Sequence, residues 1–146
     1  MKSLIVKNLN QITPQAINRN NNEFSVKTII PDDDAGKCRV NFVEVEPGNY
    51  AYGYHYHEAN EEVFYIISGT GIVRTPKGEI TLTAGDVIAF PTGEEGAHVI
   101  RNGSETEKLV YIDFGTTINP EIVHLPDFNK FMVIGSEVNG IFDKQP

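Results

Sequence analysis

The chain has 146 residues, a formal net charge of −8 and one cysteine, Cys38. This length is enough for one domain that buries roughly two-thirds of its unfolded surface, and a single cysteine cannot form an internal disulfide bond. The excess of acidic residues opposes binding to nucleic acid or to anionic membranes, because that binding depends on Lys and Arg. Since no apolar segment resembles a signal peptide or a membrane span, we expect a cytoplasmic protein with one domain over residues 1–146.

Short runs rich in Val, Ile, Phe, Tyr and Thr alternate with turn residues along most of the chain. They predict strands at residues 24–30, 39–45, 54–57, 62–68, 71–75, 80–83, 87–90, 98–102 and 108–114. Residues 68–71 and 75–78 are typical of tight reversals, and Asn102-Gly103 is typical of a type I′ turn. Because helix signals are nearly absent, the pattern predicts an all-β fold, with antiparallel strands in a sandwich or barrel.

Three segments lack the strand pattern. Residues 8–23 are rich in Asn and Gln, and within them Asn20-Asn21-Asn22 predicts a loop or a short cap. Residues 31–37 are interpreted as a solvated acidic turn, because the ligand pattern of a calcium loop is incomplete there. We expect the C-terminal extension, residues 117–146, to fold over the barrel rather than to form a second domain.

Three of the four histidines have a spacing that is typical of a metal site. His55 and His57 are two residues apart, so on a strand their side chains point to the same face. Adjacent imidazoles in an apolar interior are costly unless they coordinate or hydrogen-bond a partner. With His98 and a glutamate, they could hold one divalent transition metal and leave coordination positions open. His124 is interpreted as a surface or hydrogen-bonded histidine.

The identity of the carboxylate and of the metal stays open on these grounds. Glu61 and Glu62 are neighbours, and both faces of the strand that follows are apolar, so periodicity does not separate them. Imidazoles suit iron, nickel, copper and zinc, while a carboxylate also accepts manganese.

Two motifs resemble those of the cupin family. Gly48-(six residues)-His55-Tyr56-His57-(four residues)-Glu62-(six residues)-Gly69 is similar to the first cupin motif, and Gly85-(five residues)-Pro91-Thr92-Gly93-(four residues)-His98-(three residues)-Asn102 is similar to the second. The chain has one extra residue before His55 and two between Gly93 and His98, in expected loops where length varies at little cost. The resemblance covers about residues 38–114 and selects Glu62, which keeps the six-residue spacing to Gly69.

The resemblance implies a cupin-type double-stranded β-helix, that is, a jelly-roll barrel, with short N-terminal and C-terminal extensions. It implies one divalent ion (Mn, Fe, Ni or Zn) near one mouth of the barrel, with up to two positions open to water. The implied metal ligands are His55, His57, Glu62 and His98. It also implies a homodimer, because relatives commonly pair through edge strands and exposed sheet edges need cover.

Alternation along residues 50–57 places four tyrosines on the face opposite the histidines, where they would pack or form a subunit contact: Tyr50, Tyr52, Tyr54 and Tyr56. The alternative is that a tyrosine before the histidines bends over the pocket as a hydrogen-bond donor. The candidate catalytic residues are Glu61, Tyr50 and Tyr52. Phe64, Ile66 and Ile100 fall in phase with the ligands, and we expect them to line an apolar pocket.

These features favour a metal-dependent enzyme that acts on a small oxygen-bearing organic molecule chelated at open metal positions. Cupin relatives imply a dioxygenase or an isomerase. The alternative is a non-catalytic cupin that binds or senses a small ligand. A metal-stabilised scaffold is least favoured, because open coordination positions serve little structural purpose. Choosing one reaction from the fold would be analogy only, since the fold hosts many activities.

Overall fold

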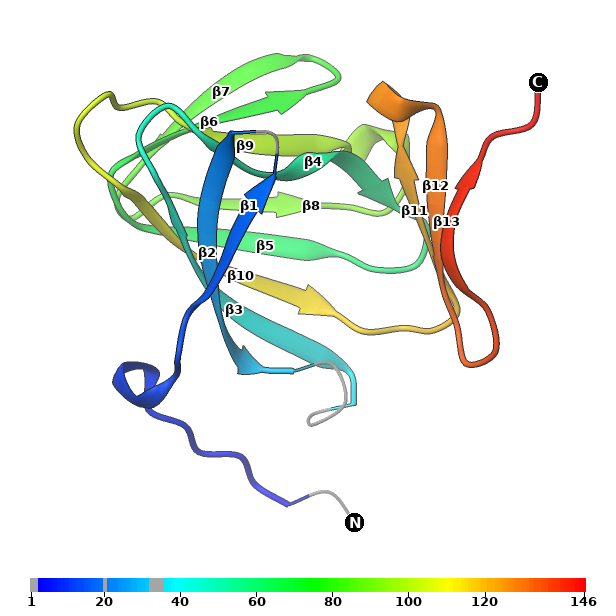
Figure 1. The fold of residues 1–146 in the computed structure, drawn as a ribbon, viewed down its shortest axis with the longest axis horizontal. Coiled ribbons are helices and arrows are strands. Elements are labelled where there is room, and N and C mark those ends of the chain that lie inside the picture. Colours follow the sequence, from blue (N-terminus) through cyan, green and yellow to red (C-terminus); the bar gives the residue numbers. More distant parts are fainter. Residues whose placement is uncertain (1–2, 20, 32–35) are drawn as a thin grey trace.

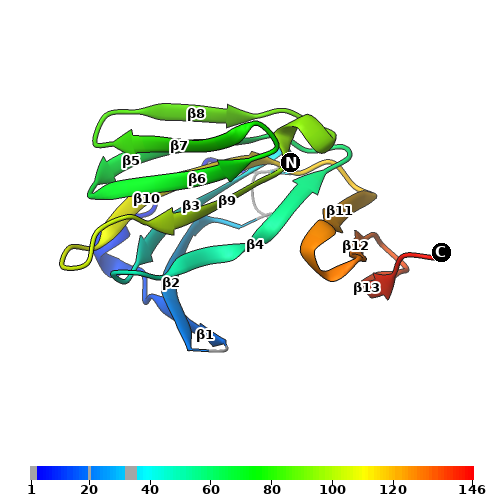
Figure 2. The same ribbon diagram turned by 90° about the horizontal axis from the view of Figure 1, so that it is seen from above.

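Two antiparallel sheets face each other and form the walls of a barrel (Figures 1 and 2). The structure is a computed structural model that describes residues 3–19, 21–31 and 36–146. Its strands are β1 (Gln15–Arg19), β2 (Asn22–Ile30), β3 (Cys38–Val45), β4 (Tyr50–His57), β5 (Glu62–Ser68), β6 (Thr70–Thr75), β7 (Gly78–Thr83), β8 (Val87–Phe90), β9 (His98–Asn102), β10 (Leu109–Thr116), β11 (Glu121–Leu125), β12 (Lys130–Ile134) and β13 (Asn139–Asp143). Three short 3-10 helices complete it: η1 (Leu9–Gln11), η2 (Glu94–Gly96) and η3 (Pro126–Phe128).

The strand order explains how distant segments meet. One sheet has the order β1-β2-β3-β10-β5-β8, and the other has the order β13-β12-β11-β4-β9-β6-β7. Strands that follow one another in sequence, such as β4 and β5, therefore often lie in opposite sheets. This arrangement confirms the all-β jelly-roll prediction. Every strand expected from the sequence is present, with ends that differ by a few residues.

The interior of the barrel changes from apolar to polar along β3 and β10. These strands pair so that Val45 lies opposite Leu109 and Val43 opposite Tyr111 at one end. At the other end Asn41 lies opposite Asp113, and Arg39 lies opposite Gly115. All of the residues named at the apolar end are buried in the hydrophobic core, whose other members are Phe24, Val26, Ala51, Phe64, Ile66, Val73, Leu82, Phe90 and Ile100. The polar end carries the side chains that could do chemistry.

The segments without a strand pattern contain more regular structure than expected. Of the loop or short cap expected at Asn20-Asn21-Asn22, Asn20 lies outside the described residues, and the Asn- and Gln-rich stretch before it contains β1, which pairs with β2. The acidic turn expected at residues 31–37 falls largely on residues 32–35, which lie outside the described residues. The C-terminal extension adds β11, β12 and β13 to the edge of one sheet, because β11 pairs with β4. It thus extends the barrel wall and forms a separate lobe beside it in Figure 2.

Two local expectations are corrected by the backbone. Asn102 does not form a type I′ turn, because the only described non-glycine residues with positive φ are Asn21, Tyr52 and Asn129. The Asn102 side chain instead donates to the carbonyls of Val45 and Glu107, at 3.0 and 2.7 Å, and so closes the loop after β9.

The regular alternation expected along β4 is wrong at Tyr52. Its φ is +60°, and the pairing between β4 and β9 shifts register between Ala51 and His55. A bulge of this kind re-aims one side chain without ending the strand. The Tyr52 ring therefore packs edge-on against the core residue Phe24, with ring centroids 4.9 Å apart. By contrast, Tyr54 lies under Arg74, and Tyr56 stacks on His124.

None of the helices among the described residues has the length and apolar character needed to cross a membrane.

Candidate metal centre

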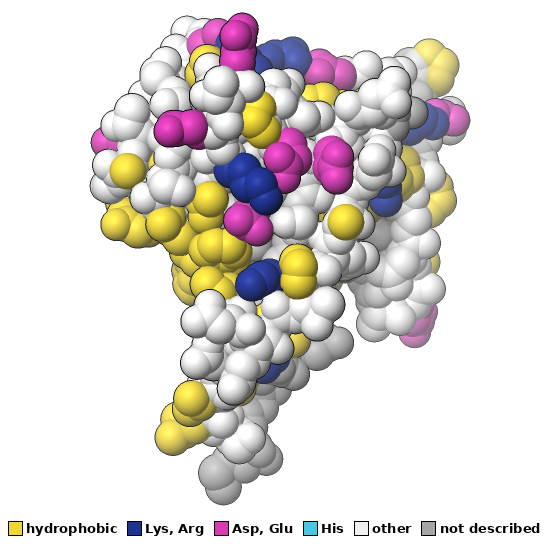
Figure 3. Space-filling view, turned by 60° about the vertical axis from the view of Figure 1, so that its left-hand side comes forward, with side chains coloured by type: hydrophobic (Ala, Val, Ile, Leu, Met, Phe, Trp, Pro, Cys, Tyr) yellow, Lys and Arg dark blue, Asp and Glu magenta, His cyan; other side chains and the backbone are white. Residues whose placement is uncertain are grey.

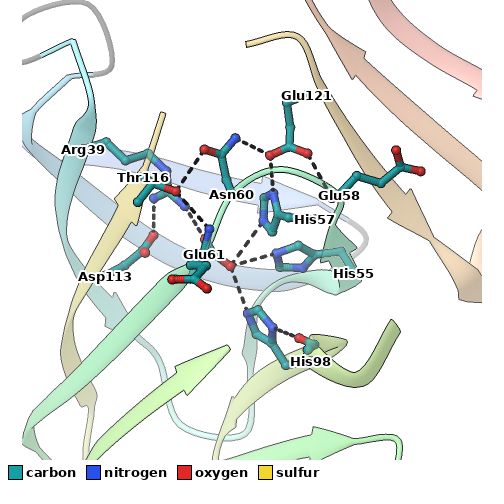
Figure 4. A network of polar contacts seen from close by, with 12 residues as sticks. Arg39, His55, His57, Glu58, Asn60, Glu61, His98, Asp113, Thr116 and Glu121 are labelled. Carbon is teal, nitrogen blue, oxygen red and sulfur yellow. Dashed lines mark hydrogen bonds and ion pairs between the residues drawn. The ribbon is translucent and has the colours of Figure 1, made fainter. Parts of the chain in front are cut away.

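Three strands bring the four sequence-predicted ligands to one point inside the barrel. His55 and His57 lie on β4, Glu62 is the first residue of β5, and His98 is the first residue of β9. His55 lies directly opposite His98 in the ladder between β4 and β9. Glu62 comes from the facing sheet, and Figure 4 shows the three imidazoles pointing toward one carboxylate oxygen. The strand pairing and the packing of the two sheets thus bring ligands that are far apart in the sequence close together in space.

The distances within this cluster suit a shared ion. Glu62 Oε2 lies 3.3 Å from His55 Nε2, 3.3 Å from His57 Nε2 and 3.1 Å from His98 Nε2. Ligand atoms of His55, Glu62 and His98 all lie within 4.8 Å of one another. Donors at roughly 2 Å from one ion are separated by about 3 to 4 Å, so small shifts would complete a coordination sphere.

Unsatisfied nitrogen atoms also fit a metal. Buried polar atoms normally have a hydrogen-bond partner. His57 Nε2 and His98 Nε2 are buried, and neither makes a hydrogen bond within the described structure. A bound cation would satisfy both lone pairs, which an apolar or purely structural cluster would leave unpaired.

Main-chain carbonyls orient two of the three imidazoles. His55 Nδ1 donates to the carbonyl of Gly53 at 2.7 Å, and His98 Nδ1 donates to the carbonyl of Gly96 at 2.8 Å. Because a carbonyl only accepts, Nδ1 must carry the proton in both rings. The lone pair of each Nε2 then points at Glu62. His98 is also held by its stacking on Phe90, with ring centroids 3.5 Å apart.

Two of the three pKa shifts at the site favour the protonation states that a metal requires. Burial alone would raise the pKa of Glu62, but its close contacts with the imidazoles of His55, His57 and His98 hold that pKa well below its usual range. Burial lowers the pKa of His98, which favours its neutral form. The pKa of His55 is raised, because contact with Glu62 outweighs the opposing effect of burial.

An arginine and an aspartate that the sequence motifs do not include lie beside the cluster. Arg39 forms ion pairs with Glu62 Oε1 and with Asp113 Oδ2, the latter at 2.6 Å. A Cβ on Gly115 would come within 2.9 Å of the Arg39 guanidinium, so this glycine leaves the space that the guanidinium fills. Asp113 was the detectable signal, because it is a single charge within the apolar strand Leu109–Thr116.

The environment of Asp113 differs from that of Glu62. Burial and the nearby charge of Glu62 raise the pKa of Asp113 to about 6, against the opposing effect of Arg39. Asp113 Oδ1 and the hydroxyl of Tyr111 are buried, and neither has a hydrogen-bond partner among the described residues.

The three candidate catalytic residues lie in different places. Glu61 and Tyr50 are exposed, and Tyr50 has 43% of its surface accessible. Tyr52 is also partly exposed, yet burial of its hydroxyl and the charge of Asp113 raise its pKa to about 12. The pKa of Tyr52 therefore responds to the charges of the site.

The expected pocket-lining residues are almost fully buried. Phe64, Ile66 and Ile100 all belong to the hydrophobic core. Phe64 contacts the His98 ring, with centroids 5.4 Å apart, and so supports a ligand directly. Whether these side chains also touch a bound molecule stays a prediction.

His124 lies outside the cluster. Its Nε2 contacts Glu58 Oε1 at 2.7 Å, and its ring stacks on Tyr56. This placement agrees with a hydrogen-bonded histidine rather than a metal ligand.

The fold and the clustered motif together define the class of protein. Residues 41–115, just over half of the chain, match the family model of the cupin domain. The chain therefore belongs to the cupin family. No curated protein sequence matches the chain.

Solved structures with the same fold cover most of the chain. A protein assigned provisionally as a sugar phosphate isomerase, from Acidithiobacillus ferrooxidans, is 23% identical, with a TM-score of 0.79, 97% of this chain covered and 91% of that one. A sugar phosphate isomerase from Silicibacter pomeroyi is 22% identical, with a TM-score of 0.79 and coverage of 94% and 91%. A protein predicted to be an oxalate decarboxylase, from Thermotoga maritima, is 26% identical, with a TM-score of 0.69 and coverage of 78% and 100%.

Proposed function

We propose that this cupin is a metal-dependent enzyme whose metal ligands are His55, His57, Glu62 and His98. The observation that carries the proposal is the convergence of three imidazole Nε2 atoms on one carboxylate oxygen, at 3.1 to 3.3 Å. Two of those nitrogens have no hydrogen-bond partner in the part of the chain that the structure describes. Three neutral imidazoles and one carboxylate suit manganese, iron, nickel or zinc and leave positions open in an octahedral ion. An ion in this place would supply Lewis acidity toward a substrate oxygen.

The residues around the cluster support a small, oxygen-bearing substrate. The free Asp113 Oδ1 and the Tyr111 hydroxyl are buried polar atoms that hydroxyl or carbonyl groups of a substrate could satisfy. Arg39 adds a fixed positive charge that is only 19% exposed. We infer that the substrate carries several oxygen atoms, as a sugar, a sugar derivative or a hydroxy acid does.

Between the two reaction types, an isomerase is favoured over a dioxygenase. An isomerase needs a group that removes a proton next to a carbonyl and returns it to a neighbouring carbon. Asp113 is suited to this role, because its free oxygen is beside the metal ligands and its pKa is raised to about 6. The similar structure from Silicibacter pomeroyi is that of a sugar phosphate isomerase, which agrees with this choice. A dioxygenase would need a redox-active metal and dioxygen, and it would not need to return a proton to a neighbouring carbon.

The metal assignment is tested by elemental analysis of protein purified without added metal. We expect the wild type and the His124→Ala variant to hold about one ion per chain, and the His57→Ala variant to lose it. Both variants remove one imidazole that contacts a glutamate, so they are matched. Equal metal contents in the two variants would reject the assignment.

The reaction type is tested with the metal-loaded protein in deuterium oxide, using a panel of aldoses, ketoses and their phosphates. An isomerase incorporates solvent deuterium next to the carbonyl, which proton NMR detects as a lost signal. Oxygen uptake that depends on iron would instead establish a dioxygenase. Saturable binding without any product would establish the ligand-binding or sensing alternative.

We also propose a homodimer that forms through the outer face of the sheet containing β3, β10, β5 and β8. Outward side chains there form two cross-strand rows, Phe42-Ile112-Tyr65-Val87 and Val40-Phe114-Val63-Ala89. The outer face of the other sheet carries ion pairs instead, such as Arg74–Asp127 and Arg101–Glu79. Figure 3 shows hydrophobic side chains gathered on one side of the molecule, beside a region of mixed charges. A second copy is the favoured occupant, because a neutral face lets two chains of charge −8 meet.

Two matched variants test this interface. Tyr65 and Ile80 are 46% and 44% exposed, and they lie on different sheets. We expect Tyr65→Glu to produce a monomer, because a twofold contact would bring the new charges together, while Ile80→Glu stays dimeric. Analytical ultracentrifugation measures both. A monomeric wild type, or a dimeric Tyr65→Glu variant, would contradict the proposal.

A further inference from the structure

The third imidazole of the cluster is oriented differently from the other two. His55 and His98 each donate through Nδ1 to a carbonyl two residues earlier in the chain. His57 Nδ1 makes no hydrogen bond of normal geometry, and it lies 3.5 Å from Glu121 Oε2. Figure 4 shows Glu121 on the side of His57 that faces away from His55 and His98. The ring of His57 thus lies between two carboxylates.

Glu121 is held firmly in this place. It is only 2% exposed, and its Oε1 accepts hydrogen bonds from the main-chain nitrogens of Glu58, Ala59 and Ile122, at 3.0, 3.1 and 2.9 Å. Its Oε2 accepts from the side-chain nitrogen of Asn60. All of these partners are donors, which suits an ionised carboxylate that cannot itself donate. The contact with His57 is then satisfied only if Nδ1 also carries a proton.

The surrounding contacts attach the C-terminal extension to the metal-binding strands. Asn60 lies in the connection between β4 and β5, and its side chain donates to the carbonyl of Ile118 at 2.9 Å. It also accepts from the main-chain nitrogen of Ile118 at 2.6 Å and from the hydroxyl of Thr116 at 3.0 Å. The chain that leads to β11 is therefore fixed against the connection that joins two ligand strands.

We propose that Glu121 is a positioning residue for the metal ligand His57, and that the C-terminal extension is in this way a part of the metal site. This inference rests on the proposed metal-binding function and adds a residue outside the matched cupin domain, which ends at residue 115. Glu121 fixes the Nδ1–H tautomer of His57, so that the Nε2 lone pair faces Glu62 and the metal. A hydrogen bond to an anionic partner also raises the basicity of the imidazole. Its Nε2 then binds a metal more strongly than it would if Nδ1 donated to a carbonyl.

The Glu121→Gln variant tests the proposal, because it keeps the shape and removes the charge. If the amide oxygen keeps the three main-chain hydrogen bonds, the amide nitrogen faces His57 Nδ1. It can then only donate, which forces the proton of His57 to Nε2 and blocks the lone pair that binds metal. We expect the affinity for Zn²⁺ and Mn²⁺, measured by competition with a chelator, to fall about 10- to 100-fold.

The matched control is Glu58→Gln, which changes a nearby glutamate whose side chain contacts His124 and not the cluster. We expect its metal affinity to equal that of the wild type. If Glu121→Gln lowers thermal stability but leaves the metal affinity of the folded protein unchanged, Glu121 is a structural residue only and the proposal is overturned.

A second measurement needs neither a variant nor a metal. Nitrogen-15 NMR of the metal-free wild type, at mildly alkaline pH where imidazoles are neutral, reports the tautomer of each histidine. We expect His57 to be protonated at Nδ1, and the Nε2–H tautomer would overturn the proposal. If the wild type binds neither metal, the proposed function fails, whereas the tautomer of His57 still decides the role of Glu121.

Discussion

The two ends of the barrel interior are built from the same strands but from opposite kinds of side chain. At one end Val43, Val45, Leu109 and Tyr111 pair across β3 and β10, and all four have no accessible surface. Two residues further along, the same ladder carries Asn41, Arg39 and Asp113 and reaches the metal ligands. Burial of the apolar side chains stabilises the fold, at about 25 cal/mol per Å² of apolar surface. The polar end has charges that are costly to bury unless they are paired.

This contrast teaches that stability and chemistry are separated along the strand axis. The apolar end holds the two sheets at a fixed spacing. Charged groups at the other end can then stay close together without water to screen them. We therefore expect substitutions at the apolar end to change the free energy of unfolding and leave metal affinity alone. Substitutions of the metal ligands and of the groups that hold them should change metal affinity.

The largest expected effect is that of Glu62→Gln on metal binding. The three imidazoles converge on this carboxylate, so the neutral amide removes both a ligand charge and the partner of Arg39. We expect metal affinity to fall by at least about 100-fold, more than for loss of a group that only orients a ligand. Isothermal titration with Zn²⁺ measures the change.

The neighbouring Glu61→Gln variant is the control, because Glu61 is exposed. Its affinity should match that of the wild type. Equal losses in both variants would mean that overall charge, rather than coordination by Glu62, controls metal binding.

At the apolar end, we expect Leu109→Ala to lower the free energy of unfolding by about 2 to 5 kcal/mol. Leu109 has no accessible surface, so its truncation leaves a cavity in addition to the lost burial. Metal affinity should not change, because Leu109 lies at the other end of β10. Urea denaturation measures the stability, with Leu4→Ala as a control because Leu4 is 97% exposed. A Leu109→Ala variant that loses metal affinity while folded would show that the two ends are coupled.

The next effect is a pH dependence that comes from Asp113. Its pKa rises from 3.8 to about 6 on folding, so the folded protein holds this proton more tightly than the unfolded chain does. The resulting stabilisation is complete below pH 3.8 and is lost as the pH rises through 6. The Asp113→Asn variant does not titrate. We therefore expect the free energy of unfolding of the metal-free variant, relative to that of the wild type, to increase by on the order of 1 to 3 kcal/mol as the pH rises from 4 to 7.

The raised pKa of Asp113 is tested only by how the stability difference between the variant and the wild type changes with pH. The difference at a single pH is not a test, because Asn also removes a charged partner of Arg39 at every pH. Denaturation curves at several pH values give the difference directly. A constant difference across the range would show that Asp113 has an ordinary pKa in the folded protein.

The sequence predicted the parts of the site that are local in the chain. His55, His57 and Glu62 lie within eight residues, and His98 follows a recognisable Pro-Thr-Gly turn, so spacing indicates the histidines, while the choice of Glu62 over Glu61 depends on the cupin motif. Arg39 and Glu121 could not be found in this way, because each is one charged residue among many and reaches the site through long-range pairing. The bulge at Tyr52 was also hidden, since a positive φ at a tyrosine has no signature in the sequence.

The C-terminal strands were missed for a related reason. Strand β11 pairs with β4 through only Val123–His57 and His124–Tyr56, and its partner is more than sixty residues earlier in the chain. Proline and glycine nearby obscured the alternation of the three strands. A strand of this kind forms because it pairs with the edge of a sheet, and its own sequence does not predict it.

The smallest effect, and the sharpest comparison of the two ends, comes from a matched pair of glycines. A Cβ on Gly115 would meet the Arg39 guanidinium at 2.9 Å, and a Cβ on Gly71 would meet Ile100 Cδ1 at 2.9 Å. Arg39 is a long side chain near the polar end, whereas Ile100 is packed in the core. We expect Gly115→Ala to cost about 1 kcal/mol of stability and to weaken metal binding several-fold, because Arg39 must move from Glu62. We expect Gly71→Ala to cost about 1 to 3 kcal/mol, from overpacking, with unchanged metal affinity. Unfolding and metal titration on the same samples separate the two quantities, and identical profiles for the two variants would contradict a division between a stabilising end and a chemical end.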